Sequence, residues 1–244
     1  PPQLWRHTGA LKRRLADVDL FIARSEFSRN KHREFGLAQP MEVLPYFLPA
    51  PFPEQPAPRM SERPQQRPYF LSVGRLARIK GLDSVIPAFR RFPDADWLII
   101  GDGNEMPELR ARAADLPNVK FLGRIANHDL RRYYEHAIAA IVPSSGYETF
   151  GIVLIEAFHY HTPVIARRIG PFPEIIERAK GGLLFSDTDE LVAAIARLHG
   201  DPELRDSFAT GAFEAARKHW SENAVVESFL DLIRNARAAK RAAR

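Results

Sequence analysis

Short apolar runs alternate with longer amphipathic segments over most of this chain. Each run is bounded by glycine, proline or charged residues and is too hydrophobic to face water, which is typical of strands buried on both faces. The predicted strands are residues 69–73, 96–100, 119–122, 139–142, 163–166 and 182–185. The predicted helices are residues 82–92, 105–114, 127–136 (capped by Asn127), 190–198, 202–219 (capped by Asp201) and 223–239 (capped by Ser221). The fold class is therefore α/β, a Rossmann-like parallel sheet with helices on both faces and further helices at the C-terminal end.

The pattern before this series is different. A strand at residues 19–23, a helix at residues 25–35 and a short strand at residues 42–44 are too few elements for a domain, so we interpret them as the end of another domain whose beginning lies outside this sequence. A proline-dense tract follows, which can form neither a helix nor a central strand. The four predicted parts are the domain remnant 1–44, the linker 45–68, the sheet domain 69–220, and a C-terminal helix with a basic tail, 221–244.

Two carboxylates lie in residues 146–157, a segment that reads as a glycine turn followed by the first turns of a predicted helix. Glu148 lies just before the helix and Glu156 inside it, so at about 1.5 Å of rise per residue the pair spans roughly 10 Å. The amides of Thr149 to Val153 lie between them, where the unpaired donors of a helix N-terminus attract phosphate. The alternative is a helix-start acid and a solvated helix acid. The apolar neighbours of Glu156 favour a ligand contact, because a carboxylate without a partner is costly there.

Two cations follow the first strand of the sheet. In an open α/β sheet, ligands bind beyond the carboxyl ends of the strands, and Arg75 and Lys80 lie at that edge. Their side chains can neutralise a diphosphate leaving group, whereas the alternative is that both are ordinary loop cations. The turn at residues 101–103 ends the second strand at the same edge. The sequence thus predicts an anion site between two acids.

Composition limits the class of protein. The chain has 244 residues, 45% hydrophobic and 27% charged, which is typical of a globular domain, and its apolar runs are too short to span a bilayer. It has no cysteine, so disulfides and thiolate metal sites are excluded, and we expect a cytoplasmic protein. The net charge of +5 comes partly from five cations near the C-terminal end, Arg234, Arg237, Lys240, Arg241 and Arg244. They are either a solvated helix end or a weak peripheral contact with anionic lipid, and no basic stripe with aromatic residues indicates a nucleic-acid partner.

No metal site is expected. The three Asp-x-Asp triplets at residues 17–19, 94–96 and 187–189 precede strands or begin a helix, and no histidines have zinc-ligand spacing. A nucleophile elbow and a Walker loop are also absent from the sequence.

Taken together and in order, the motifs resemble the donor-binding half of retaining glycosyltransferases of glycosyltransferase family four, which have the GT-B fold. The segments that carry the resemblance are Ser72-Val73-Gly74-Arg75-Leu76 with Lys80-Gly81, Ile99-Ile100-Gly101-Asp102-Gly103, Phe121-Leu122-Gly123-Arg124, and Glu148-Thr149-Phe150-Gly151 with Glu156-Ala157 and Pro163-Val164-Ile165-Ala166. Residues 19–25 and 43–45 resemble the end of the family's N-terminal, acceptor-binding domain.

The resemblance implies transfer of a sugar from a nucleoside-diphosphate sugar to a glycan, lipid or small-molecule acceptor, with retention of anomeric configuration and without a metal or other cofactor. It assigns the catalytic roles to Arg75, Lys80 and Glu148. The implied donor contacts are Arg75 and Lys80 with the diphosphate, Ile125 with the nucleobase, Glu148, Thr149, Phe150 and Gly151 with the sugar, Ile152 and Val153 with phosphate, and Glu156 with the ribose.

The chain departs from the family in two respects. His161 stands where the family often has glycine, and most of the acceptor-binding domain is missing. The competing hypotheses are a sugar-nucleotide epimerase of the same fold and a non-catalytic nucleotide-sugar-binding fragment. We expect the 244-residue chain alone to be incomplete for catalysis.

Overall fold

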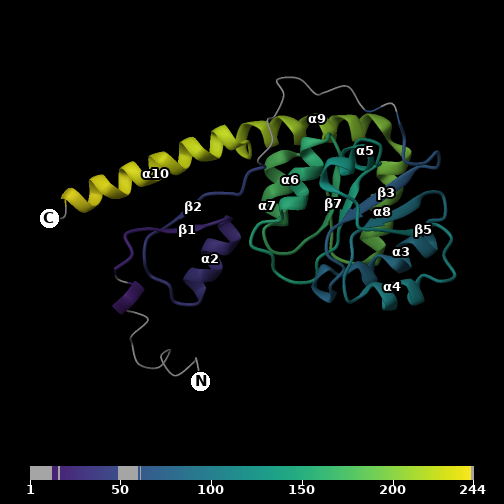
Figure 1. Ribbon diagram of the computed structural model, residues 1–244, viewed down its shortest axis with the longest axis horizontal. Coiled ribbons are helices and arrows are strands. Elements are labelled where there is room, and N and C mark those ends of the chain that lie inside the picture. Colours follow the sequence, from purple (N-terminus) through teal and green to yellow (C-terminus); the bar gives the residue numbers. More distant parts are fainter. Residues whose placement is uncertain (1–12, 16, 49–59, 61, 243–244) are drawn as a thin grey trace.

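The computed structural model describes residues 13–15, 17–48, 60 and 62–242. Most of them form one parallel six-stranded sheet with strand order β5-β4-β3-β6-β7-β8 (Figure 1). The strands are β3 (Tyr69–Val73), β4 (Asp96–Ile100), β5 (Val119–Gly123), β6 (Ala140–Val142), β7 (Val164–Arg167) and β8 (Gly182–Phe185). All six lie where the apolar runs predict them, and the α/β fold class is confirmed.

Helices cover both faces of the sheet. On one face lie α5 (Leu130–Glu135), α6 (Ile152–His159), α7 (Phe172–Ala179) and α9 (Pro202–His219). On the other lie α3 (Ile86–Arg91), α4 (Met106–Arg112) and α8 (Thr188–Gly200). Each strand contributes alternate residues to the two cores, so Leu71 packs under the first layer of helices and Phe70 under the second. This two-sided burial explains why the strands read as continuous apolar runs.

Three helical segments differ from those predicted from the hydrophobic pattern. The segment predicted as a helix at residues 82–92 begins with a 3₁₀ turn, Leu82–Ser84, before α3. The Asn127 cap was wrong: Asn127–Asp129 is itself a 3₁₀ turn that runs into α5, and no side chain caps either. Helix α7 was not predicted, although the proline in its first turn is favoured at a helix start.

Aspartates cap two helices, and the cap predicted at Asp201 is confirmed. Asp187 Oδ1 accepts a hydrogen bond from the Glu190 amide at 2.9 Å, and Asp201 Oδ1 accepts one from the Leu204 amide at 2.9 Å. Ser221 Oγ accepts from the Ala224 amide at 3.4 Å at the start of α10 (Glu222–Ala242). These caps satisfy helix amides that have no partner within their own helix.

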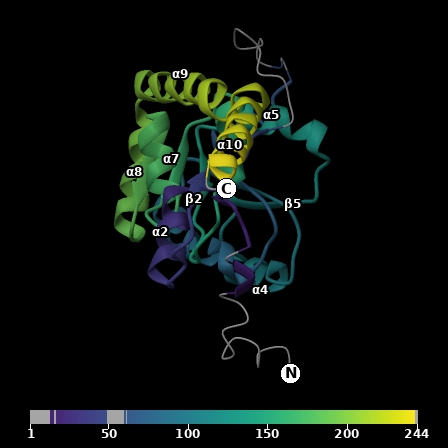
Figure 2. The ribbon, with the colours of Figure 1, turned by 90° about the vertical axis from the view of Figure 1, so that its left-hand side faces the viewer.

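The N-terminal elements form a separate small unit. Strands β1 (Phe21–Ala23) and β2 (Met41–Val43) pair in parallel, with α2 (Glu26–Glu34) between them. Helix α10 extends away from the six-stranded sheet and over this unit, as Figure 1 shows, and Figure 2 looks along it from its C-terminal end. Lys240 Nζ of α10 lies 2.8 Å from Asp19 Oδ2 beside β1, which ties the two ends of the described chain together.

Candidate functional site

The candidate site lies where the order in which strands are added to the sheet reverses, between β3 and β6. From β3 the chain builds outward through β4 to β5, and it then returns to the other side of β3 to build β6, β7 and β8. The loops after β3 and β6 therefore separate and leave a crevice at the carboxyl ends of these strands, the usual ligand position in open α/β sheets. A cavity of about 420 Å³ occupies the crevice, lined by Arg75 and Lys80 after β3, Ser144 after β6, and Ile152, Val153 and Glu156 of α6.

Two glycines allow the loops at this edge to approach closely. Gly101, at the end of β4, has φ +138, and a Cβ atom there would lie 1.8 Å from the carbonyl oxygen of Gly74. Gly81 has φ +63, and a Cβ atom would lie 2.5 Å from the carbonyl oxygen of Pro143. Gly81 thus lets the loop that carries Lys80 lie against the end of β6, where the Ser145 amide donates to the Ile79 carbonyl at 2.9 Å.

The two predicted cations have different surroundings. Arg75 is exposed at the cavity wall, and no carboxylate among the described residues pairs with it. Lys80 Nζ donates to Glu148 Oε1 at 2.7 Å. The structure therefore brings Lys80 and Glu148 together, although 68 positions separate them in the sequence.

Glu148 is half-enclosed and does not cap a helix. Its Oε1 also accepts from Ser144 Oγ at 2.6 Å, and α6 begins only at Ile152, after Gly151 in a left-handed conformation (φ +107). The interpretation of Glu148 as a helix-start acid is therefore wrong, and Ser144, its second partner, was missed by the sequence reasoning. Of the amides predicted to attract phosphate, only those of Ile152 and Val153 belong to the helix.

The residues between Glu148 and the helix have other contacts. The Thr149 carbonyl accepts from Ser25 Oγ at 3.0 Å, which joins the loop to the start of α2. The Phe150 ring is buried against Tyr46 and Trp220 and leaves only its backbone for a ligand.

Glu156 is half-buried and lines the cavity from α6. Burial raises its pKa, and a hydrogen bond from the Tyr134 hydroxyl to Oε2 at 3.3 Å opposes that shift. The interpretation of Glu156 as a solvated helix acid is therefore wrong. Tyr134 was also missed, because only the packing of α5 against α6 brings the two residues together.

A second cavity of about 460 Å³ adjoins the first and shares Gly74, Arg75 and Asn127 with it. Arg124 and Ile125, after β5, form its far wall, with the turn at residues 101–103. The predicted nucleobase residue Ile125 therefore lies beside the predicted diphosphate residue Arg75.

Comparison with known proteins identifies the family. The family model described as glycosyl transferases group 1 matches residues 54–215. The chain belongs to the glycosyl transferases group 1 family. A GDP-mannose-dependent alpha-(1-6)-phosphatidylinositol monomannoside mannosyltransferase of Mycolicibacterium smegmatis is 32% identical over 87% of the chain and 60% of its own length. The chain spans between 32% and 65% of the length of the curated relatives it matches.

Solved structures confirm the GT-B type of fold. The sucrose-phosphate synthase of Thermosynechococcus elongatus superposes with a TM-score of 0.79 at 25% identity, over 98% of this chain and 64% of that one. HepE of Anabaena in complex with UDP and glucose superposes with a TM-score of 0.76 at 20% identity, over 88% of this chain and 63% of that one.

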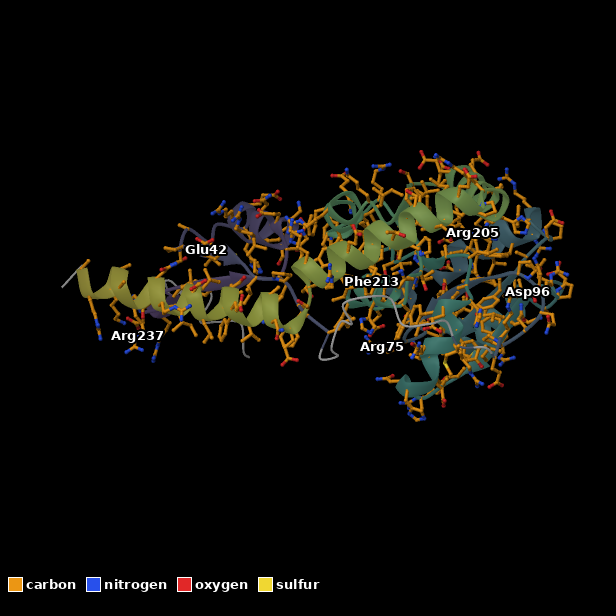
Figure 3. All side chains as sticks on the ribbon, turned by 90° about the horizontal axis from the view of Figure 1, so that it is seen from above. Glu42, Arg75, Asp96, Arg205, Phe213 and Arg237 are labelled. Carbon is orange, nitrogen blue, oxygen red and sulfur yellow. The ribbon has the colours of Figure 1, made fainter. Side chains whose placement is uncertain are left out.

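The Asp-x-Asp triplet that contains Asp96 lies away from the cavity in this group 1 chain. The Asp96 carboxylate lies at the amino edge of the sheet, 2.8 Å from Arg67 Nε and 2.5 Å from Lys120 Nζ, and Figure 3 shows it far from Arg75. Within the described parts of the chain, no three histidine, aspartate or glutamate side chains gather as a metal site.

His161, where glycine is frequent in the family, has φ +55 and stacks on Phe213, so the departure affects backbone conformation and packing.

The C-terminal basic residues lie on α10. Arg237 is exposed on α10, far from Arg75 (Figure 3), while Arg234 pairs with Asp231 and Lys240 with Asp19. Arg244 lies outside the described residues. Across the described helices, none combines the length and apolar character needed to cross a bilayer.

Proposed function

We propose that this chain is the donor-binding half of a glycosyltransferase that transfers a sugar from a nucleoside-diphosphate sugar to a glycan or lipid-linked acceptor, with retention of anomeric configuration. The observation that carries the proposal is the charge pattern around one cavity. Arg75 and Lys80 line the cavity together with the N-terminus of α6, and Glu156 lies on one wall. Glu148 accepts a hydrogen bond from Lys80 at the edge of the cavity.

The proposed chemistry follows from these charges. The bond between the sugar carbon and the diphosphate oxygen breaks, and negative charge accumulates on the departing diphosphate while the sugar becomes cation-like. Arg75, Lys80 and the amides of Ile152 and Val153 stabilise the diphosphate, and the carboxylate of Glu148 stabilises the sugar. These side chains supply the charge stabilisation that a divalent metal supplies in other transferases.

Several comparisons support the donor class. Solved structures of the same fold include HepE with UDP-glucose, and the name of the mannosyltransferase of M. smegmatis specifies GDP-mannose and a phosphatidylinositol glycolipid. Exposed cations on α10, such as Arg237, support a peripheral contact with anionic lipid if the acceptor is lipid-linked.

The small β1–β2 unit supports the assignment of residues 1–44 to the end of an acceptor-side domain. A two-stranded parallel sheet does not form a stable unit alone, because parallel sheets are normally buried on both faces. Orientation of two substrates in a cleft accounts for up to roughly 7–11 kcal/mol of barrier reduction in favourable reactions. We therefore expect the 244-residue chain to bind donor but to transfer sugar poorly.

Calorimetric titration with UDP, GDP and ADP tests donor binding. We expect one of them to bind, and Arg75→Ala to weaken it by about 10- to 150-fold, the value of a lost charge-assisted hydrogen bond. Arg78→Ala is the matched control, since Arg78 is exposed in the same loop but lines neither cavity. Absence of binding by all three nucleotides overturns the proposal.

Glu148→Gln tests the sugar contact. We expect the free nucleoside diphosphate to bind at least as well as before, because Lys80 loses a competing carboxylate but keeps its own charge. The additional affinity that the sugar provides should be lost, because the substitution removes the negative charge assigned to the sugar. A uniform loss for both ligands contradicts this assignment. Donor consumption that needs no acceptor would instead favour the epimerase. Donor binding without any turnover in a protein that includes the acceptor-side domain would favour a non-catalytic module.

A further inference from the structure

Glu156 is held by a single buried phenol. Tyr134 on α5 is 1% exposed, and its hydroxyl lies 3.3 Å from Glu156 Oε2. The hydroxyl is the only side-chain hydrogen-bond partner of the Glu156 carboxylate among the described residues. Two other enclosed carboxylates differ: the buried Glu135 pairs with Arg131, and the half-buried Glu174 accepts from two backbone amides.

The phenol is a permanent donor. Burial, together with the nearby Glu156 charge, raises the pKa of Tyr134 well above its usual value, so the hydroxyl keeps its proton at neutral pH. A phenol that donates to Oε2 leaves Oε1 without a partner among the described residues, on a residue that lines the cavity. A carboxylate oxygen is an acceptor only, so its natural ligand is a hydroxyl or N–H donor.

We propose that Tyr134 is the positioning residue that turns the free oxygen of Glu156 toward the ribose hydroxyls of the donor and thereby gives the site its preference for ribonucleotides. The inference rests on the proposed function. A glutamate side chain has three rotatable bonds, and fixing one oxygen lowers the entropy lost when the other binds a hydroxyl. A salt bridge in place of the phenol would neutralise the charge that strengthens such a bond.

The test compares a nucleoside diphosphate with its 2′,3′-dideoxy analogue, using whichever of UDP, GDP and ADP the wild type binds most tightly. We expect the wild type to prefer the ribonucleotide by about tenfold or more, since removing the hydroxyls leaves a buried acceptor unpaired. In Tyr134→Phe this preference should fall by about fivefold, while the affinity for the dideoxy analogue stays within twofold.

Tyr69→Phe is the matched control. Tyr69 is 2% exposed in the same core, and its hydroxyl donates to the Tyr133 carbonyl at 2.8 Å, so the substitution removes an equally buried phenol that does not touch Glu156. We expect it to lower the thermal midpoint but to leave the ribose preference unchanged. An unchanged preference in Tyr134→Phe, or an equal loss in Tyr69→Phe, overturns the inference.

A second variant covers the case in which Tyr134→Phe does not fold. The double variant Tyr134→Phe, Glu156→Gln leaves no buried charge without a partner, so we expect it to fold. Its ribose preference should equal that of Glu156→Gln alone, because Tyr134 acts only through the carboxylate. A further loss in the double variant contradicts the inference. A wild type that binds both analogues equally also contradicts it, whereas a wild type that binds no nucleotide overturns the proposed function instead.

Discussion

The contact between α2 and α7 offers the most direct test of the packing. Glu174 on α7 accepts from the Glu26 amide through Oε1 and from the Phe27 amide through Oε2, both at 3.1 Å. Ser25 Oγ accepts from the next amide, that of Ser28, at 3.0 Å. The first turn of α2 is therefore capped largely by a carboxylate about 150 positions away in the sequence.

Glu174→Ala should release this helix end. Hydrogen bonds to a charged acceptor contribute about 1.5–3 kcal/mol each, and the two together would give more. Two effects reduce the sum: the freed amides become hydrated, and burial raises the pKa of Glu174, so its charge is costly in the folded state. We therefore expect the attachment of α2 to weaken by about 2 kcal/mol, comparable with the loss of a strong N-cap.

Amide hydrogen exchange measures this local change. A loss of about 2 kcal/mol accelerates exchange through local opening roughly 30-fold, and we expect this at Glu26 and Phe27 while the six-stranded sheet is unaffected. Glu177→Ala is the control, because Glu177 is exposed on the same helix. Unchanged exchange at these amides, or equal acceleration in the control, would refute the capping argument.

Two further predictions concern the edge of the sheet that carries the site. Burial raises the folded-state pKa of Glu156 above its usual 4.5, so ionisation costs stability as the pH rises through that raised value. Glu156→Gln should therefore have a higher thermal midpoint than the wild type at pH 7, and the difference should vanish below about pH 4; a difference that persists there would contradict the assignment. Gly101→Ala should cost more than about 3 kcal/mol in denaturant unfolding, because its Cβ atom would overlap the Gly74 carbonyl at 1.8 Å; a cost below 1 kcal/mol would mean that the loop relaxes easily.

The strands were predictable because their signal is local. A central parallel strand has both faces buried, so residues 69–73 and 96–100 are apolar regardless of which strand lies beside them. The strand order is not encoded in this way. That β6 returns to β3 is a long-range fact, and it places Lys80 beside Glu148.

The errors around the site have the same origin. Glu148 has the sequence position of a helix-start acid, but the left-handed Gly151 delays the helix to Ile152. Tyr134 looks like any apolar residue of an amphipathic helix, and only the packing of α5 against α6 shows that its hydroxyl faces Glu156. Local patterns identify residue types and elements, whereas tertiary contacts decide which pairs act together.

The two acids of the site are held in opposite ways, and the proposed reaction gives a reason. Glu148 accepts a hydrogen bond from Lys80, a cation that also lines the cavity proposed for the diphosphate. As the diphosphate gains charge in the transition state, it attracts Lys80 more strongly, and Glu148 becomes free to stabilise the cation-like sugar. Glu156 is assigned to a ribose that does not change during transfer, so it needs a fixed orientation and a neutral partner. Tyr134 supplies both without adding a charge that would compete with Arg75 and Lys80 for the diphosphate.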